Sequence, residues 1–511
     1  MISQNQIDKA IERAKILFSP AGFGMLKDLF FKYGVGLAIL FLGLVSVYVN
    51  VMVLVHVPTA NGDSVEHIHS SFLVALGYVP YRDFFQHHNP LMWFIFAPVT
   101  WFFRYDVTVS EVLSFISFMV FLKSLVYVYK ISDEFLANKY WGILGGLFLC
   151  VPDNKLYAID FRPDNYMVFA LIGGIYYYFR YLRDKETKDL VISFVFFVLS
   201  FLFAQKAIFS LFVLGLTGLY FWHKKTIKTK DMLLALLCSG SLLAIFLLYL
   251  LYYKILKLYY VSNFTFNLNL AEVFEFGRVC EIPLYMKVFF TIAWVGAIGA
   301  LFFKNRYQII IAILFMSEFV QRVSYFSPYS YYYWQLLYFA VLMSLPVLKK
   351  LDDKNRLVRV MCVCGVGVML NYSYSFYMKM IEANKDRAYM PDYIARKITP
   401  CDYVFNGDKL MYNMFARDPH YYWQLIGQLD VVGEKTGIAP KPNMNELILK
   451  YMPRFIYGYN YFNKVATELG RKEIVHYIDR ELVEKYYDKT QFYGVYELKK
   501  EFVKECNILK N

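Results

Sequence analysis

The chain has 511 residues, of which 58% are hydrophobic and only 19% are charged, and its mean hydropathy is +0.37. A soluble protein of this length needs more charge to cover its surface, so the composition excludes an ordinary soluble domain and predicts a polytopic membrane protein. The net charge of +13 comes from basic residues spread over short loops, which indicates membrane orientation and argues against nucleic-acid binding.

The first elements in chain order are an N-terminal segment and a series of apolar runs. Residues 1–32 are polar and amphipathic, and we expect them to be cytoplasmic and not a cleavable signal peptide. Residues 33–378 predict a transmembrane helix bundle of about eleven spans, several of them shorter than the ~20 residues that a perpendicular helix needs. The predicted spans are 33–55, 107–129, 140–152, 165–182, 190–204, 207–222, 231–253, 284–303, 307–321, 331–348 and 357–377. Residues 90–103 are too short to span and predict an interfacial helix.

Basic loops predict the orientation of this bundle. Residues 180–188, 223–230, 304–306 and 349–359 are rich in Lys and Arg. Counting the spans alternately from the basic N-terminus places all four loops in the cytoplasm, as the positive-inside rule requires. The N-terminus is therefore expected inside and the C-terminus outside.

The composition changes after residue 378. Residues 379–511 are charged, contain several prolines and lack a spanning run, while short runs within them have strand or helix patterns. We expect a small soluble α/β domain outside the cytoplasm, so that the fold class is a mainly α, polytopic membrane protein with an outer C-terminal domain. Cys401 and Cys506 fall in this domain, and their positions leave a disulfide open.

Ionisable side chains near a bilayer are costly and usually functional. In this chain they collect on the predicted outer face, in loops that are far apart in the sequence. The set comprises Asp63, Glu66, His67, His69, Arg82 and His88 in the first outer loop, Arg162 and Asp164 in the second, Lys206 at the third outer turn and Arg322 at a later one. Because these positions fall at one height in the membrane, they could surround one cavity.

The residue types in this set suit group transfer. A carboxylate in a partly dry pocket can act as a general base toward a hydroxyl, and Lys and Arg can hold a phosphate and stabilise a leaving group. The chain has no glycine-rich phosphate loop and no dinucleotide fingerprint, which argues against a soluble nucleotide donor. The pattern therefore indicates transfer from a membrane-anchored phosphate donor.

Metal binding is the alternative role for the histidines. His67 and His69 could ligate a divalent metal together with Asp63, but such histidines more often make hydrogen bonds at the interface. We therefore predict no metal site and no cofactor, and favour a metal-independent reaction while a divalent metal stays possible.

Four short motifs follow one another along the predicted outer face: GDSVEH (62–67), GYVPYRDFFQHHNPLMW (77–93), RPDN (162–165) and AQKAIF (204–209). Their order and sidedness resemble the C-type integral-membrane glycosyltransferases. Within this family the chain is similar to the branch that holds the protein mannosyltransferases and the lipid A aminoarabinose transferase. The resemblance covers roughly residues 33–380, and the outer domain matches more loosely.

The resemblance implies that a sugar is transferred with inversion from a polyprenyl phosphate to an acceptor hydroxyl at the outer face of a bacterial inner membrane. It implies that Asp63 is the general base and that Asp164 is the second acid. Lys206 would meet the donor phosphate, with Arg162 as a second phosphate ligand. We also expect a catalytic role for Glu66. The residues expected to contact the substrates are His67, His69, Arg82, His88 and Arg322.

Three positions depart from the family pattern. Glu66 stands three residues after the first acid and not next to it, which weakens a protein acceptor. Ala207 replaces a glycine after the phosphate-binding lysine, and His88 stands where the aminoarabinose enzyme has a lysine. We therefore expect a lipid-anchored glycan as acceptor, with lipid A or core oligosaccharide favoured.

Other interpretations remain open. Asp63 could cap an interfacial helix, Arg162 and Asp164 could form a structural ion pair, and Lys206 could extend to the interface. A transporter or flippase would place its charges at mid-span in repeated halves, whereas these charges lie at one end of the spans. An oligosaccharide ligase or polymerase would place its basic residues in a late outer loop, whereas here the acids come early.

Overall fold

The computed structural model describes residues 34–56, 62–150, 158–273, 284–303, 305–324, 333–384, 389–406, 413–421, 443–457, 478–504 and 506. The N-terminal segment 1–32, predicted to be cytoplasmic and amphipathic, lies outside the described residues.

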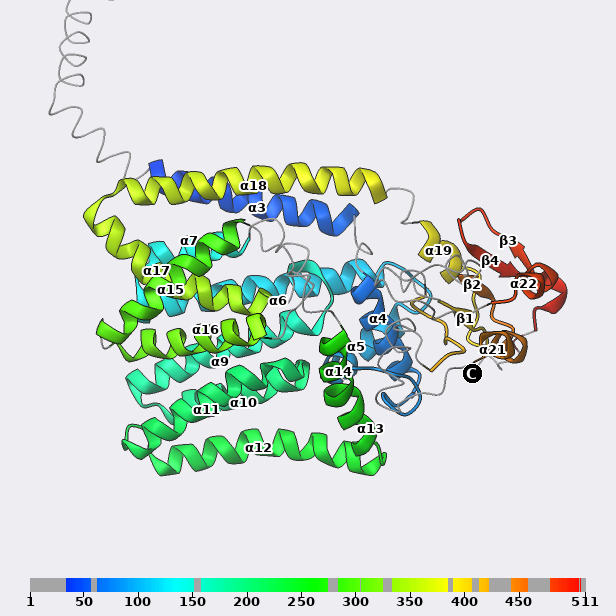
Figure 1. The fold of residues 1–511 in the computed structure, drawn as a ribbon, viewed down its shortest axis with the longest axis horizontal. Helices are drawn as coiled ribbons and strands as arrows, with labels where there is room; N and C mark the ends of the chain where they lie inside the picture. Colours follow the sequence, from blue (N-terminus) through cyan, green and yellow to red (C-terminus); the bar gives the residue numbers. More distant parts are fainter. Residues whose placement is uncertain are drawn as a thin grey trace, which may run out of the picture.

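Each predicted span overlaps a helix of the bundle (Figure 1). These helices are α3 (Val35–His56), α6 (Val109–Ile131), α7 (Lys139–Leu149), α9 (Pro163–Asp184), α10 (Thr187–Phe203), α11 (Ile208–His223), α12 (Thr229–Tyr252), α15 (Leu284–Phe303), α16 (Arg306–Ser324), α17 (Trp334–Lys354) and α18 (Leu357–Asn384). Within the described part of the chain, 6 helices are long and apolar enough to cross a membrane. The mainly α, polytopic class is therefore confirmed, and the count of about eleven spans stays a prediction.

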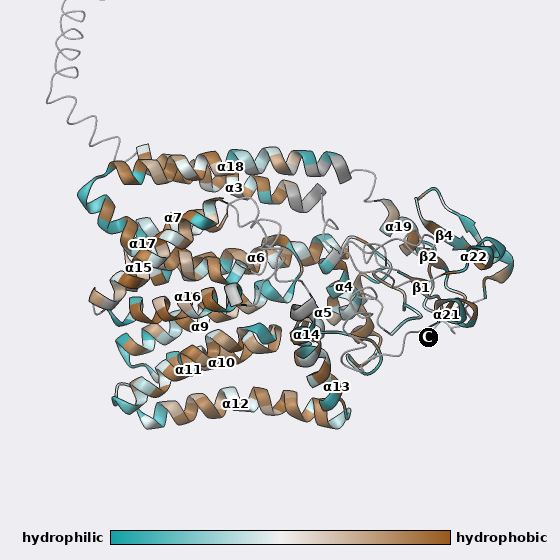
Figure 2. Cartoon of the chain, viewed as in Figure 1, coloured by the Kyte–Doolittle hydropathy of each residue, from teal (hydrophilic) through white to brown (hydrophobic). Residues whose placement is uncertain are grey.

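The outermost helices carry the apolar surface that a bilayer covers. Helix α12 lies at one edge of the bundle, and most of its residues are hydrophobic (Figures 1 and 2). Leu233, Leu237 and Leu248 are 62%, 70% and 63% exposed. In water such a continuous apolar surface would drive aggregation, whereas lipid tails accept it. By contrast, the first half of α17 is buried among its neighbours.

Glycines allow close helix packing in the bundle. A Cβ added at Gly174 of α9 would lie 2.5 Å from the Phe197 ring of α10, and one added at Gly296 of α15 would lie 2.5 Å from the Met343 carbonyl oxygen of α17. Only glycine fits at such distances, as is common where membrane helices cross. The tight α9–α10 contact is relevant to the site because α9 begins and α10 ends near the same polar cluster.

Short helices cover the end of the bundle at which the polar residues gather. They are α4 (Gly62–Ala75), α5 (Leu91–Phe102), α13 (Leu256–Tyr260), η4 (Val261–Thr265) and α14 (Phe266–Val273). Helix α5 is the predicted interfacial helix, and it packs against α4 (Figure 1). The segment assigned to the first outer loop therefore contains a helical hairpin, with α4 and α5 as its arms.

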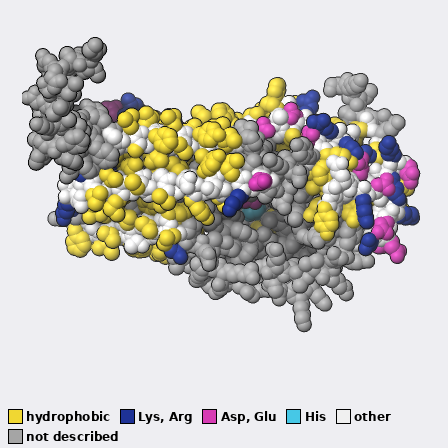
Figure 3. Space-filling model, turned by 90° about the horizontal axis from the view of Figure 1, so that it is seen from above, with side chains coloured by type: hydrophobic (Ala, Val, Ile, Leu, Met, Phe, Trp, Pro, Cys, Tyr) yellow, Lys and Arg dark blue, Asp and Glu magenta, His cyan; other side chains and the backbone are white. Residues whose placement is uncertain are grey.

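Beyond these short helices the chain forms a small sheet with strand order β1-β2-β4-β3. Strand β1 pairs parallel to β2, while β4 pairs antiparallel to both β2 and β3. The elements are α19 (Tyr389–Ala395), β1 (Val404–Phe405), α21 (Met444–Tyr451), β2 (Phe455–Tyr457), α22 (Arg480–Tyr486), β3 (Tyr487–Lys489) and β4 (Val495–Leu498). On the face seen in Figure 3, charged side chains gather at this end of the molecule, and hydrophobic ones lie over much of the bundle.

A disulfide joins the two ends of this region. The S–S distance between Cys401 and Cys506 is 2.02 Å. Helix α18 ends at Asn384, close to the predicted boundary at residue 378. The division into domains at that residue and the placement of the sheet outside the membrane stay predictions.

Candidate active site

Three short segments bring the predicted acids and cations to one end of the bundle. Asp63 lies in the first turn of α4. Arg162 immediately precedes α9, which begins with Pro163, and Asp164 lies in its first turn. Proline suits the first helical position because it needs no donor there, and an acid is favoured by the positive end of the helix dipole. Lys206 lies in η3 (Gln205–Ala207), the break between α10 and α11.

These four side chains form a chain of alternating charges. Arg162 Nη1 lies 2.9 Å from Asp63 Oδ2, and Arg162 Nε lies 3.6 Å from Asp164 Oδ2. Lys206 Nζ contacts the other carboxylate oxygen of Asp164. Buried charges need partners, and here each cation has an acid beside it. A phosphate that entered the site would meet two cations whose positions are already fixed.

A buried polar network lies next to this chain. Arg322 Nη2 lies 3.4 Å from Glu318 Oε2 within α16. The other oxygen of Glu318 accepts a hydrogen bond of 2.6 Å from Ser210 Oγ and one of 2.8 Å from Gln335 Nε2. The charges of Arg322 and Glu318 act on Lys206, so the network and the ion-pair chain share one electrostatic environment.

Histidine rings form a second cluster on the hairpin. The ring centroids of His67 and His88 are 5.2 Å apart, and those of His87 and His88 are 4.2 Å apart. Trp93 Nε1 donates a hydrogen bond of 3.2 Å to His67 Nδ1. Burial lowers the pKa of His87 to about 4; the Asp63 carboxylate raises it and the Arg162 cation lowers it. The imidazoles are therefore neutral near pH 7, and they lie within electrostatic reach of the ion-pair chain.

The hairpin loop is tied to the break before α11. The His87 carbonyl oxygen accepts hydrogen bonds from Gln205 Nε2 at 2.8 Å and from Asn267 Nδ2 at 3.0 Å. Gln205 directly precedes Lys206. The hydrogen bond from Gln205 therefore holds the histidine cluster next to Lys206, the last cation of the ion-pair chain.

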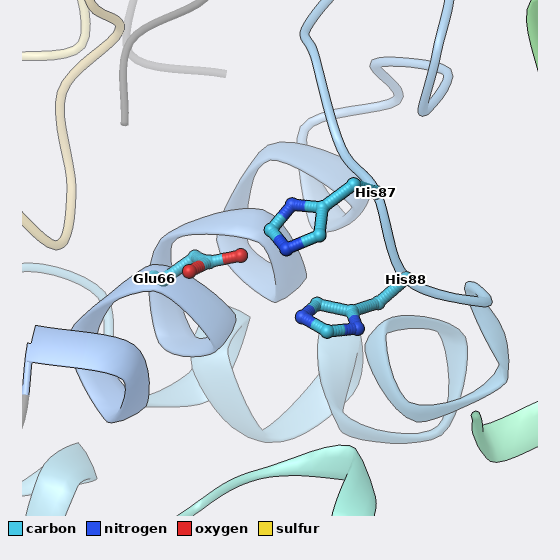
Figure 4. Close-up of side chains that lie close together, drawn as sticks. All are labelled: Glu66, His87 and His88. Atoms are coloured by element: carbon cyan, nitrogen blue, oxygen red, sulfur yellow. The ribbon is translucent and has the colours of Figure 1, made fainter. Parts of the chain in front are cut away.

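One group in this cluster has the composition of a metal site. Glu66 projects from α4, and His87 and His88 project from the loop before α5 into the same space (Figure 4). Their potential ligand atoms all lie within 4.8 Å of one another. The group differs from the combination of Asp63, His67 and His69 that the sequence suggested as the alternative metal site.

Two predicted substrate-binding residues lie away from the chain of charges. His69 Nδ1 lies 3.3 Å from the Met414 carbonyl oxygen, so His69 contacts the C-terminal region. Arg82 is exposed, pairs with Asp83 at 2.8 Å and faces the Tyr253 ring at 5.6 Å.

The C-terminal region contributes to this site through residues 413–421. Tyr421 OH donates a hydrogen bond to the Tyr81 carbonyl oxygen, and the Tyr421 carbonyl oxygen accepts one of 3.0 Å from the Phe85 backbone. The Phe415 ring packs edge-on against Phe72 of α4 with centroids 5.4 Å apart. The segment therefore packs against α4 and against the loop that joins α4 to α5.

The structure thus brings Asp63, Arg162, Asp164 and Lys206 into direct contact, although the role of each stays a prediction. It adds residues that the sequence analysis did not assign to the site, chiefly His87, Trp93, Gln205 and Glu318. Two of these stood beside assigned residues, since His87 precedes His88 and Gln205 precedes Lys206. Glu318 gave a weaker signal, an acid one helical turn before Arg322.

The fold is shared with solved membrane enzymes. ArnT from Cupriavidus metallidurans bound to undecaprenyl phosphate superposes with a TM-score of 0.51 over 78% of this chain and 88% of that chain, at 11% identity. The apo oligosaccharyltransferase of Archaeoglobus fulgidus superposes with a TM-score of 0.50 over 89% of this chain and 73% of that chain, at 13% identity. No family model matches the sequence, and no curated protein matches it. The chain therefore has the fold of the C-type integral-membrane glycosyltransferases, and the predicted resemblance is confirmed at the level of the fold.

Proposed function

We propose that the protein is an inverting glycosyltransferase that moves a sugar from a polyprenyl-phosphate donor to a hydroxyl of an envelope glycolipid or glycan. Lipid A or core oligosaccharide is the favoured acceptor. The observation that carries the proposal is the alternating chain of Asp63, Arg162, Asp164 and Lys206, held by three elements at one end of an apolar helix bundle.

The reaction is a single displacement. The Asp63 carboxylate takes the proton of the acceptor hydroxyl, and the oxygen attacks the anomeric carbon of the donor sugar. The bond between that carbon and the phosphate oxygen breaks, and the electron pair leaves with the polyprenyl phosphate. Lys206 and Arg162 exchange their carboxylate partners for phosphate oxygens and stabilise this charge, while Asp164 orients the donor sugar or the acceptor.

Two observations support a lipid-linked donor at an extracytoplasmic site. The ArnT structure that shares the fold was solved with undecaprenyl phosphate bound, a ligand of the class proposed here. The disulfide between Cys401 and Cys506 suits an oxidising compartment, which agrees with a C-terminal domain outside the cytoplasm. We accordingly propose a multi-pass protein of a bacterial inner membrane, with the N-terminus inside and the outer domain in the periplasm.

The experiment compares envelope glycolipids from cells with and without the gene by mass spectrometry. We expect one sugar residue to disappear from lipid A or core oligosaccharide without the gene and to return with the wild-type gene. Asp63→Asn should not restore it, because general-base catalysis contributes roughly 10²–10⁴-fold to such reactions. Asp133→Asn is the matched control, since Asp133 is an exposed acid that follows α6 at the far end of the bundle.

Full restoration by Asp63→Asn at normal membrane levels would reject the assignment of the base. Unchanged lipid A and core together with altered attachment or length of a surface polysaccharide would replace the proposed acceptor with that of a ligase or polymerase.

A further inference from the structure

The displacement described above assigns no step to Glu66, His87 or His88, and the predicted catalytic role of Glu66 and substrate contact of His88 stay untested. We propose that Glu66, His87 and His88 form a binding site for a divalent transition-metal ion such as Zn²⁺. Metal binding goes beyond the proposed function and can be measured without glycosyl transfer, so the failure of one proposal leaves the other intact.

The separation of the three side chains is close to that of a formed site. Their potential ligand atoms lie within 4.8 Å of one another. Zinc–nitrogen and zinc–oxygen bonds of about 2.0–2.2 Å place neighbouring ligands roughly 3.3 Å apart in a tetrahedral site. Binding would require rotations of these side chains that shorten the separations, and all three already point into the same space (Figure 4).

The backbone that carries the histidines is anchored on several sides. The His87 carbonyl oxygen accepts hydrogen bonds from Gln205 and Asn267, and the His88 carbonyl oxygen accepts one of 2.5 Å from Tyr81 OH. Glu66 lies in the second turn of α4. Ligands whose backbones are fixed before the ion arrives lose little entropy on binding it, which favours a metal site.

A buried ring nitrogen in the same group lacks a hydrogen bond. His87 Nδ1 is inaccessible to solvent, and no described residue gives it a hydrogen-bond partner. Buried polar atoms are rarely left in this state, and coordination of an ion by the imidazole is one way to satisfy it. Glu66 itself is only 4% exposed, so its carboxylate lies in the same low-dielectric space.

The ligand set selects the class of ion. Mg²⁺ and Ca²⁺ prefer oxygen ligands, whereas two imidazoles with one carboxylate suit Zn²⁺ and similar first-row ions. A bound ion would join the loop before α5 to α4, one helical turn from Asp63. Its role would be to position the hairpin, since the proposed proton transfer already has a base.

The test measures metal on the full-length protein in detergent. Wild-type protein stripped by a chelator is titrated with Co²⁺ and followed by visible absorption, then competed with Zn²⁺, and metal content is measured by mass spectrometry. We expect one ion per chain in the wild type. Glu66→Gln and His87→Asn should weaken its binding more than about tenfold, because even outer-shell changes weaken metal sites 10–100-fold.

His223→Asn is the matched control, because His223 is exposed at the end of α11 and should leave binding unchanged. If a variant fails to fold, the melting temperature of the wild-type protein is measured with and without each ion. Zn²⁺ should raise this melting temperature and Mg²⁺ should not. A wild type that takes up no stoichiometric Co²⁺ or Zn²⁺, or folded Glu66→Gln and His87→Asn variants that bind like the wild type, would overturn the proposal.

Discussion

Arg162 is the side chain whose removal tests the ion-pair chain most directly. It is buried, and its guanidinium contacts Asp63 on one side and Asp164 on the other. Arg162→Met keeps most of the apolar stem and removes the charge, so it leaves two carboxylates without the cation between them. We expect the variant to lose stability, and we expect part of the loss to depend on the presence of Asp63.

The size of that dependence follows from distance and exposure. Unit charges about 4 Å apart attract by about 4 kcal/mol at an effective dielectric constant near 20. The Asp63 side chain is 34% exposed, so water screens its attraction to Arg162. We therefore expect a coupling of about 1 kcal/mol with Asp63. The Asp164 side chain is 10% exposed, and its coupling should be larger, about 2–3 kcal/mol, despite the longer distance of 3.6 Å.

A double-mutant cycle measures the coupling. The free energy of unfolding is obtained by detergent denaturation in mixed micelles for the wild type, Arg162→Met, Asp63→Asn and the double variant, and then for the corresponding set with Asp164→Asn. Additivity within about 0.3 kcal/mol in both cycles would contradict the ion pairs, because residues in direct contact deviate from additivity by more.

Three further outcomes are expected. Lys206→Met should lower both the donor affinity and the rate of sugar transfer at least about tenfold, whereas Lys206→Arg should retain part of both. A radiolabelled polyprenyl-phosphate donor measures the two quantities. Equal activity of Lys206→Met and the wild type would show that Lys206 does not belong to the site. Glu318→Gln should destabilise the protein by about 1–3 kcal/mol, seen as a lower melting temperature, because it leaves the Arg322 charge without its acid; an unchanged melting temperature would contradict the pair. Cys401→Ser removes a disulfide between residues separated by 105 positions, and the chain-entropy model gives such a disulfide about 4–5 kcal/mol of stability. Limited proteolysis should therefore cut the C-terminal region of Cys401→Ser faster than that of the control Cys238→Ser, which changes a cysteine within α12.

The contacts of the acids and cations could be anticipated because membrane topology limits where a loop residue can lie. Arg162 and Lys206 follow different helices, yet alternate spans bring both to the same end of the bundle. Pro163 also predicts the start of α9, which sets the position of Asp164. Distance in sequence therefore mattered little for these residues.

The grouping of the histidines could not be anticipated because it depends on a helix within the outer loop. In α4 each residue turns by about 100°, so His69 lies about 120° around the helix from Asp63 while Glu66 and His67 lie near it. If this segment were an irregular loop, Asp63, His67 and His69 could all point toward one metal ion. The partner of His69, Met414, lies in the C-terminal region, and no local pattern indicates that contact.

The pairing of His69 with Met414 also affects how the protein is made. The two residues are 345 positions apart, and Tyr421 lies 340 positions after its own partner Tyr81. At ribosomal speeds of about 5–20 residues per second, the hairpin is synthesised roughly 20–70 s before the segment that covers it. During that interval α4 lacks the backbone contact that His69 makes in the finished fold. The final packing of the hairpin therefore follows the synthesis of nearly the whole transmembrane part of the chain.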